Sequence, residues 1–504
     1  MGEYVIGVDV GTTATKGMLV SQSGEIVRTA SRTYELIKPD SVRTEQRAQD
    51  WWQTLVEVVR ECTRDLDLSK RDQAVALSVS TQGGSMVPVD AHGNPLSNAI
   101  VWLDRRGQAQ REHMLSLHDD EFFYRKTGFH LGTGLNLVAI AWIRDNDTEL
   151  FQRTHKFLST QDYLNLHLTG TPAIDYTNAA MTQLMDVVSG EWDEALMEAV
   201  GVGQERLAPI FEAGAFVGTL TNTAAEQLGL STSVRVYNGA HDQYCAAVGS
   251  GTFELGDLML STGTAWVILG VFDGPAYDAE AGVAPRRHVV KGLWGSLASL
   301  PTAGLSMEWF RHGLALRVET GQGADVESYA DIDRQAATRM EKAERVLVYP
   351  YLRGSSFPSR SGDVKACIVG LGLEHDRYDI ALATMECVAF EARRLVERFQ
   401  QLGCRRSVRV LGGAARSDLW AGIIAHVMGG RVIRLKQADA ACMGAAIIAG
   451  SESGVFSSYQ HGYSQMSPGD VVMELDPEKV EHYELKYQRY LEGIPAIHRF
   501  YERN

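Results

Sequence analysis

Cysteine pairs, long apolar runs and positive charge are all scarce in this sequence of 504 residues. The six cysteines include no C-x-x-C pair, so the pattern suggests neither a zinc site nor a disulfide framework and fits a reducing compartment. No apolar run approaches the ~18 residues of a membrane span, and Glu3 stands where a secretory signal peptide would be basic. We therefore expect a cytoplasmic protein without a membrane partner.

The shortage of basic residues bears on possible partners. Lysine and arginine number 48 against 63 aspartates and glutamates, which leaves a formal net charge of −15. An acidic chain without a long basic block repels a phosphate backbone, and this argues against nucleic acid as a partner.

Apolar residues are plentiful, at 45% of the chain against 22% charged residues. This balance is typical of a globular enzyme. The length indicates two to four domains, and the clefts between domains are where ligands most often bind.

The spacing of apolar residues predicts a mixed α/β chain. A hairpin and a third strand are expected over residues 4–10, 15–20 and 25–30, followed by an amphipathic helix over residues 48–65. Further strands are predicted at 74–80, 86–90, 234–239, 257–260, 265–270 and 408–411, and further helices at 107–117, 134–145, 162–168, 381–400 and 419–428.

The chain also shows signs of duplication. A small-residue stretch near residues 249–252 places a domain boundary there, which gives domains of residues 1–248 and 249–504. The strand, Gly/Thr turn and strand over residues 258–270 repeat the plan of residues 5–20. This weak repeat predicts two similar lobes whose turns face each other across a cleft.

The first of these turns has the composition of a phosphate-binding loop. Gly11, Thr12 and Thr13 offer N–H and hydroxyl donors, Lys16 adds a positive charge, and Asp9 can hold Mg²⁺ through water. The spacing is not that of a Walker loop, and a strand follows in place of a helix. From this segment alone, a hairpin turn with a capping aspartate explains the pattern equally well.

Two turns in the second half could hold the rest of a nucleotide. Thr262, Gly263 and Thr264 supply further donors, and residues 411–417 offer a surface without large side chains that suits adenine or ribose. A tight strand-to-helix turn is the competing interpretation. The candidate contacts in this second turn are Gly412, Gly413, Ala414 and Ser417.

Asp242 is the candidate catalytic base. It follows the strand predicted over residues 234–239 and sits near the start of a small-residue helix. A carboxylate there, with Gln243 beside it, could accept the proton of a hydroxyl that lies in line with a γ-phosphate. An ordinary helix-capping aspartate is the alternative, and His241 is a local competitor for the role of base.

Residues 100–106 gather an aromatic face, a carboxylate and two guanidinium groups. Trp102 could cover the apolar face of a polyol while Asp104 and Arg105 bond its hydroxyls. A core tryptophan beside a surface ion pair is the competing interpretation.

Taken in order, these segments resemble the FGGY family of carbohydrate kinases, and residues 175–179, 349–354 and 441–446 extend the resemblance over nearly the whole chain. The resemblance implies an α/β fold of two actin-like ATPase (ribonuclease H-like) domains with a central nucleotide and substrate cleft. It also implies ATP with Mg²⁺, lobe closure that keeps water from the γ-phosphate, Asp242 as the catalytic base, and Asp9 and Asp242 beside the metal.

The acceptor region departs from the family pattern. Gln82 matches the family pattern. Gly83 and Gly84 stand at the positions where the pattern of xylulose kinases looks like Met-His and that of glycerol kinases looks like Arg-Glu. We expect these three residues to contact the substrate. We also expect the missing side chains to enlarge the pocket or to pass recognition to backbone and neighbouring groups, which favours a bulkier or differently oriented sugar.

The resemblance implies phosphorylation of a small sugar or polyol, with a ketopentose such as xylulose first and gluconate, erythritol or another polyol behind it. An actin-like or chaperone-like ATPase without a small-molecule acceptor is the alternative from another class, and it would leave Trp102 and Asp242 without a role. A degenerate binding protein of the same fold would not need both Asp9 and Asp242. Dimers are common in the family, so a homodimer is expected.

Overall fold

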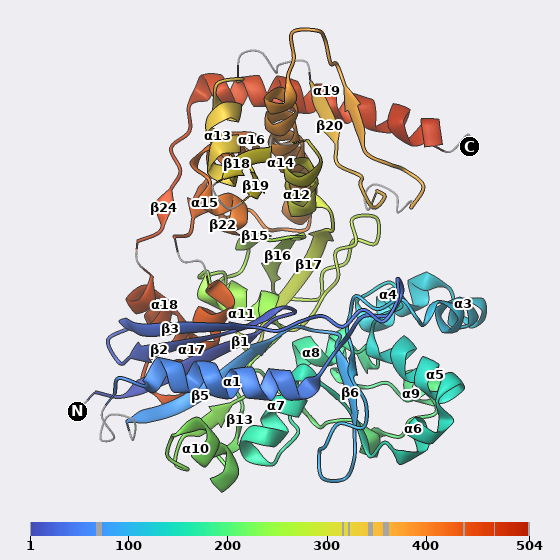
Figure 1. The fold of residues 1–504 in the computed structure, drawn as a ribbon, viewed down its shortest axis with the longest axis vertical. Coiled ribbons are helices and arrows are strands. Elements are labelled where there is room, and N and C mark those ends of the chain that lie inside the picture. Colours follow the sequence, from blue (N-terminus) through green and yellow to red (C-terminus); the bar gives the residue numbers. More distant parts are fainter. Residues whose placement is uncertain are drawn as a thin grey trace.

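Two six-stranded sheets, each in a lobe of its own, form the framework of the protein (Figure 1). The computed structural model describes residues 2–66, 73–314, 317–320, 323–340, 346–355, 362–436, 439–467 and 469–501. No helix within these ranges is long and apolar enough to cross a membrane.

The first sheet has the strand order β13-β14-β5-β1-β2-β3. β1 pairs antiparallel with β2 and parallel with β5, and β5 pairs parallel with β14. The hairpin and third strand predicted at the start of the chain are confirmed. The strands are β1 (Tyr4–Val10), β2 (Ala14–Ser21), β3 (Ile26–Thr33), β5 (Ala74–Thr81), β13 (Phe216–Thr219) and β14 (Arg235–Tyr237).

The second sheet repeats this plan. β15 pairs antiparallel with β16 and parallel with β22, β22 pairs parallel with β23, and β16 pairs antiparallel with β17. The predicted internal repeat is therefore present as a repeated topology. The strands are β15 (Leu258–Thr262), β16 (Trp266–Phe272), β17 (Trp294–Leu300), β22 (Val408–Gly412), β23 (Val432–Arg434) and β24 (Val471–Val472).

Smaller sheets surround these two. A four-stranded sheet has the order β4-β7-β6-β8 and belongs to the part of the first lobe that carries α3 to α9 (Figure 1). Its strands are β4 (Glu45–Gln46), β6 (Met86–Val89), β7 (Ala99–Ile100) and β8 (Lys156–Ser159). The two-stranded ladders are β9 (Ile174–Asp175) with β12 (Ile210–Phe211), β10 (Met185–Asp186) with β11 (Glu191–Trp192), β18 (Arg317–Thr320) with β19 (Gly323–Val326), and β20 (Leu347–Tyr349) with β21 (Cys367–Val369).

Amphipathic helices cover the sheets, as the apolar periodicity predicts. α1 (Ala48–Thr63) buries Trp51, Leu55 and Val59 beside β2 and β3, and α14 (Arg377–Gln401) starts four residues before its predicted position and lies at the core of the second lobe. The other helices of the first half are α3 (Gln108–Leu117), α4 (Asp120–Thr127), α5 (Asn136–Asn146), α6 (Thr148–Arg153), α7 (Thr160–Thr169), α8 (Tyr176–Met181), α9 (Glu194–Val200), α10 (Asn222–Leu228) and α11 (Asp242–Gly249). Those of the second half are α12 (Ala303–Gly313), α13 (Tyr329–Ala337), α15 (Gly413–Arg416), α16 (Asp418–Met428), α17 (Ala440–Ser453), α18 (Tyr459–Met466) and α19 (Pro477–Tyr501).

The small-residue helix α17 lies against the first lobe although it comes late in the sequence (Figure 1). A Cβ atom on Gly7 of β1 would lie 2.4 Å from the carbonyl oxygen of Cys442, and one on Gly444 would lie 1.8 Å from that of Cys245 in α11. Only glycine permits backbones to approach so closely, so the small residues of α17 allow its backbone to contact β1 and α11. α17 packs on the first sheet although it follows residue 248 in the sequence. The division into domains of residues 1–248 and 249–504 therefore stays a prediction.

Candidate active site

The first part of the site forms where parallel strands of the first sheet end. Asp9 lies near the end of β1, Gln82 directly follows β5, and Asp242 begins α11 after β14. Backbone bonds join these ends: the Gln82 N–H donates to the Val10 carbonyl at 2.9 Å, and the Thr81 N–H donates to the Ala240 carbonyl at 3.2 Å. Ligands of α/β proteins commonly bind beyond the carboxyl ends of such strands.

The phosphate-sized turn between β1 and β2 is held from outside. The Gly11 N–H donates to the Ala14 carbonyl at 3.0 Å and closes the turn. Tyr34 donates its hydroxyl to the Gly11 carbonyl, and the Gln46 side chain donates to the Thr12 carbonyl at 2.5 Å. With these carbonyls bonded on the protein side, the turn has a defined shape, and the Thr13 side chain is exposed.

Two carboxylates meet beside this turn. Burial and the nearby charge of Asp242 raise the pKa of Asp9 to about 7, against a 2.8 Å hydrogen bond from the Ser80 hydroxyl. Burial also raises the pKa of Asp242 to about 6, while the Gln243 side chain and N–H oppose the increase. Two neighbouring carboxyl groups that repel each other in this way suit a divalent cation.

Asp242 is not a helix cap. The N-cap position of α11 belongs to His241, whose side chain makes no capping bond. Asp242 is the first residue of the helix, with its side chain partly exposed. The structural alternative that the sequence left open for this residue therefore does not hold.

Lys16 points from β2 to a carboxylate of the second half of the chain. Its ammonium lies 2.5 Å from Asp439 Oδ1, directly before α17, and both side chains are partly exposed. The bond to Asp439 and the charge of Asp9 raise the pKa of Lys16 against the effect of burial, so the residue keeps its positive charge beside the turn.

The acceptor residues expected after β5 line a closely packed wall. Gln82 is buried, and its amide donates to Gln46 Oε1 at 2.8 Å. Trp102 is 44% exposed and donates its indole N–H to the Thr12 hydroxyl at 3.1 Å, which links this wall to the phosphate-sized turn. The space beside Gly83 and Gly84 is already filled by other side chains, so of the two predicted consequences the enlarged pocket is wrong, and recognition by backbone and neighbouring groups stays a prediction.

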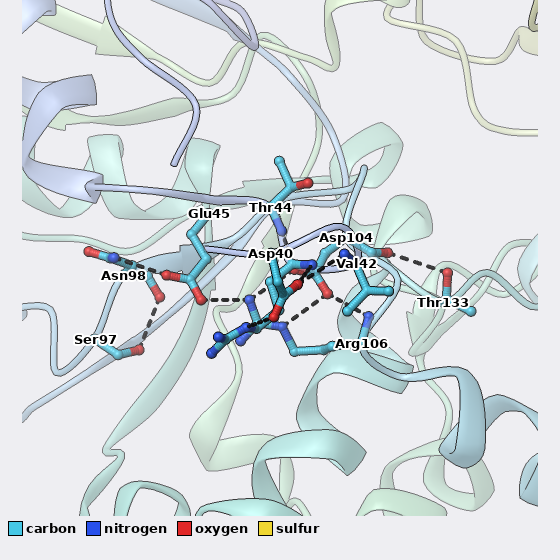
Figure 2. Close-up of polar contacts among 10 residues, drawn as sticks. Asp40, Val42, Thr44, Glu45, Ser97, Asn98, Asp104, Arg106 and Thr133 are labelled. Carbon is cyan, nitrogen blue, oxygen red and sulfur yellow. Dashed lines mark hydrogen bonds and ion pairs between the residues drawn. The ribbon is translucent and has the colours of Figure 1, made fainter. Parts of the chain in front are cut away.

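Asp104 and Arg106 form a network of bonds around Thr44 and Glu45 (Figure 2). Asp104 is buried, and its two carboxylate oxygens accept from the Thr44 N–H at 2.6 Å and from the backbone and guanidinium of Arg106. Arg106 also forms an ion pair with Glu45, in which Nη2 and Oε1 lie 2.6 Å apart. Arg105 donates to the Ser41 carbonyl at 2.9 Å. These bonds already satisfy the Asp104 carboxylate. They therefore do not favour the predicted contact of Asp104 and Arg105 with acceptor hydroxyls.

The second part of the site joins two turns of the second lobe. The Thr262 hydroxyl donates to the Leu411 carbonyl at 2.6 Å and accepts from the Ala414 N–H at 3.0 Å. Gly412 has φ of 95°, and a Cβ atom there would lie 2.9 Å from the Thr262 backbone. Glycine is required at this position by both the backbone conformation and the close approach.

These two turns border a pocket of about 670 Å³. The volume lies within the range of small-molecule sites. Of the residues predicted to bind nucleotide here, Gly412 alone is not part of the lining, and Ser417 also caps α16 by accepting from the Trp420 N–H at 3.0 Å. The predicted residues that line the pocket are Thr262, Gly263, Thr264, Gly413, Ala414 and Ser417.

Much of this pocket was not predicted from the sequence. Trp266 and Trp420 lie with ring centroids 5.2 Å apart, and Asp333 of α13 adds a carboxylate whose pKa burial raises. Nothing in the sequence around Asp333 marks it, since it reaches the pocket through the packing of α13. Arg416 also lines the pocket, and its position inside the glycine-rich segment is a sequence signal that could have identified it as a candidate nucleotide contact.

Comparisons with known proteins agree with this geometry. The model of the N-terminal domain of the FGGY family of carbohydrate kinases matches residues 4–249, and the model of its C-terminal domain matches residues 258–453. The chain belongs to the FGGY family of carbohydrate kinases. It is therefore a sugar kinase with the two-domain actin-like fold of that family, and ATP is the phosphate donor of FGGY kinases.

The similar proteins are named after more than one substrate. The xylulose kinase of Bacillus subtilis is 28% identical over 489 residues, with 97% of this chain and 96% of the relative covered. The gluconokinase of the same organism is 23% identical over 462 residues, with 91% and 89% covered. The crystal structure of xylulose kinase from Rhodospirillum rubrum superimposes with a TM-score of 0.89 at 25% identity, covering 99% of this chain and 100% of that chain.

Proposed function

We propose that this FGGY kinase transfers the γ-phosphate of ATP to a hydroxyl of a small sugar or polyol, with Asp242 as the catalytic base. The observation that carries the proposal is the meeting of Asp242 and Asp9 beside the Gly11–Thr13 turn, at the carboxyl ends of neighbouring parallel strands. A pKa of about 6 leaves the Asp242 carboxylate ionised at neutral pH, as a base requires.

Asp9 and Asp242 are the groups that would hold Mg²⁺. Mg²⁺ commonly binds one or two carboxylates together with substrate phosphates and water, and the mutual repulsion of this pair fits such an ion. The ion would supply charge neutralisation for the triphosphate. Within the described residues no group of three or more metal-ligating side chains gathers, which agrees with a metal shared with ATP.

The nucleotide would occupy both turns. We place the base and ribose in the pocket of about 670 Å³ next to Trp420 and Ala414, and the phosphates between the Thr262–Thr264 turn and the Gly11–Thr13 turn, where Lys16 adds positive charge. Closure of the two lobes would bring these turns together and exclude water from the γ-phosphate.

A ketopentose such as xylulose is the first acceptor we propose, because xylulose kinases recur among the similar proteins. Gluconate, erythritol and other polyols are the next candidates, gluconate because a gluconokinase is also similar.

The decisive experiment measures ADP release by purified protein with pentuloses, hexuloses, polyols and sugar acids, alongside Asp242→Ala. We expect one acceptor class to accelerate turnover, and Asp242→Ala to lose at least ~100-fold in kcat while remaining folded. Asp119→Ala removes a true helix-capping aspartate of α4 and is the matched control, with kcat unchanged. ATP turnover that no acceptor accelerates would instead support an actin-like ATPase, and retained activity in Asp242→Ala would move the base elsewhere.

The homodimer and the cytoplasmic location stay predictions. Light scattering of the purified protein tests the first, and fractionation of the source cells tests the second.

A further inference from the structure

The two glycines at the acceptor wall leave no empty space. A Cβ atom on Gly83 would lie 2.6 Å from His241 Cδ2 and 2.6 Å from Met181 Cγ. On Gly84, at φ of 72°, it would lie 2.5 Å from Leu135 Cδ2 and 3.6 Å from Met181 Cε. Real Cβ atoms do not approach other atoms within 3.0 Å, so the side chains of His241 and Met181 occupy the position beside Gly83 and that of Leu135 the position beside Gly84.

His241 is held in this position by its backbone. Its N–H donates to the Thr177 hydroxyl at 2.8 Å, and that hydroxyl donates in turn to Asp175 Oδ2 at 2.5 Å. Its backbone also forms a parallel bridge with Thr81 at the end of β5. The conspicuous Asp-Tyr-Thr-Asn segment at residues 175–178 therefore has a structural role, because it fixes the strand end that carries His241 and Asp242.

The imidazole places a polar edge next to the proposed base. His241 Nε2 lies 3.3 Å from Asp242 Oδ1 and 3.0 Å from the position of a Cβ atom on Gly83. The residue is 9% exposed, and Nδ1 has no hydrogen-bond partner among the residues that the structure describes. Nε2 is therefore the imidazole nitrogen that lies on the Asp242 side of this wall.

We propose that His241 and Met181 determine acceptor specificity, with His241 Nε2 bonding the oxygen on the carbon next to the one phosphorylated. Met181 and Leu135 fill the space beside Gly83 and Gly84, so the site takes a slender open-chain polyol or ketose with oxygens on adjacent carbons and disfavours a bulkier sugar. This inference rests on the proposed function, since it concerns the acceptor of the same reaction.

A set of four proteins tests the steric part: the natural protein, Gly83→Ala, His241→Ala and the double variant. His241→Ala should raise the acceptor KM roughly tenfold, the value of one lost hydrogen bond, with the KM for ATP changed less than twofold. Gly83→Ala should lower acceptor kcat/KM roughly tenfold or more, and the double variant should lose less than the product of the two single losses, because the missing imidazole removes one of the two close contacts of the new methyl group and leaves the one with Met181 Cγ. Gly274→Ala, where a Cβ atom meets nothing within 4 Å, should leave all constants unchanged. Losses that multiply in the double variant would overturn the inference.

Two acceptor comparisons test the chemical part. An acceptor that lacks the oxygen next to the phosphorylated carbon should be used equally by the natural protein and His241→Ala, whereas the full acceptor should not. Met181→Ala should raise kcat/KM for a hexulose relative to a pentulose roughly tenfold. An equal loss on both acceptors in His241→Ala, or an unchanged ratio in Met181→Ala, would contradict the assignment.

The unfolding temperatures of the four proteins separate this inference from the proposed function. If no acceptor is phosphorylated by the natural protein, the proposed function fails, yet the steric coupling still predicts that the loss of Tm in Gly83→Ala is relieved in the double variant. If the Tm losses simply add, the placement of His241 beside Gly83 is wrong whatever the activity.

Discussion

Lys16 and Asp439 form an ion pair at 2.5 Å although 423 positions separate them in the chain. The pair joins β2, next to the Gly11–Thr13 turn, to the start of α17. It lies close enough to Asp9 that both charges affect the pKa of that carboxyl group, Lys16 lowering it and Asp439 raising it. The second half of the chain therefore contributes directly to the charge around the first phosphate-sized turn.

Lys16→Met should weaken ATP binding. Loss of the cation leaves Asp439 unpaired beside the triphosphate, so we expect the KM for ATP to rise roughly tenfold or more, in line with a charged hydrogen bond of about 1.5–3 kcal/mol, with the acceptor KM nearly unchanged. Initial-rate kinetics and calorimetric titration with ATP measure this. Lys291→Met, which removes a lysine whose side chain is 82% exposed, is the control and should change neither constant. An unchanged KM for ATP in Lys16→Met would remove Lys16 from the phosphate site.

Asp9→Asn should stabilise the metal-free protein at high pH. The pKa of Asp9 is about 7 in the folded protein against an ordinary value of 3.8, so between about pH 4 and pH 7 the folded state binds more protons than the unfolded state and stability falls as the pH rises. The variant removes this loss, and we expect a gain on the order of 2 kcal/mol at pH 8 and almost none at pH 4.

Urea unfolding in EDTA at both pH values measures the effect of Asp9→Asn. Asp40 supplies a control of opposite sign, because backbone N–H bonds from Arg43 and Val42 lower its pKa to about 2. Its contribution to stability is present above pH 4, so Asp40→Ala should lose stability at pH 8. A gain of equal size at pH 4 and pH 8 in Asp9→Asn would show that burial and repulsion do not raise the pKa of Asp9.

Asp104→Ala should act on stability. The substitution leaves the Thr44 N–H and part of the buried Arg106 guanidinium without a partner, and breaking a buried pair costs about 3 kcal/mol. Denaturant unfolding measures the loss, and Glu149→Ala, from an exposed pair with Arg153, should cost less than about 0.5 kcal/mol. Unchanged stability with a raised acceptor KM would instead restore Asp104 as an acceptor contact.

Gly444→Ala should disturb the contact between α17 and α11. The new methyl group would lie 1.8 Å from the Cys245 carbonyl oxygen, so the helices must separate, at a cost of about 3 kcal/mol. Gly422→Ala in α16, where a Cβ atom meets nothing within 4 Å, should be neutral or stabilising by up to about 1 kcal/mol. Thermal unfolding compares the two, and similar Tm values for both variants would contradict the close approach of α17.

Local pattern was enough for the two hairpins at residues 4–20 and 258–270, for the long helix α14 and for the motif order that resembles the FGGY family. These features depend on periodicity and on turn residues, which operate between neighbours in the chain. The same motifs led to Asp9, Asp242 and the Thr262–Thr264 turn as candidates.

Tertiary structure alone decided which side chains fill the wall at Gly83, what Asp104 bonds and where α17 lies. The sequence shows that residues 83 and 84 lack side chains, but whether that makes a cavity depends on Met181 and His241, which arrive from distant segments. Close packing leaves few voids in a protein interior, so a missing side chain is commonly replaced by a neighbour in space, and no local pattern names that neighbour.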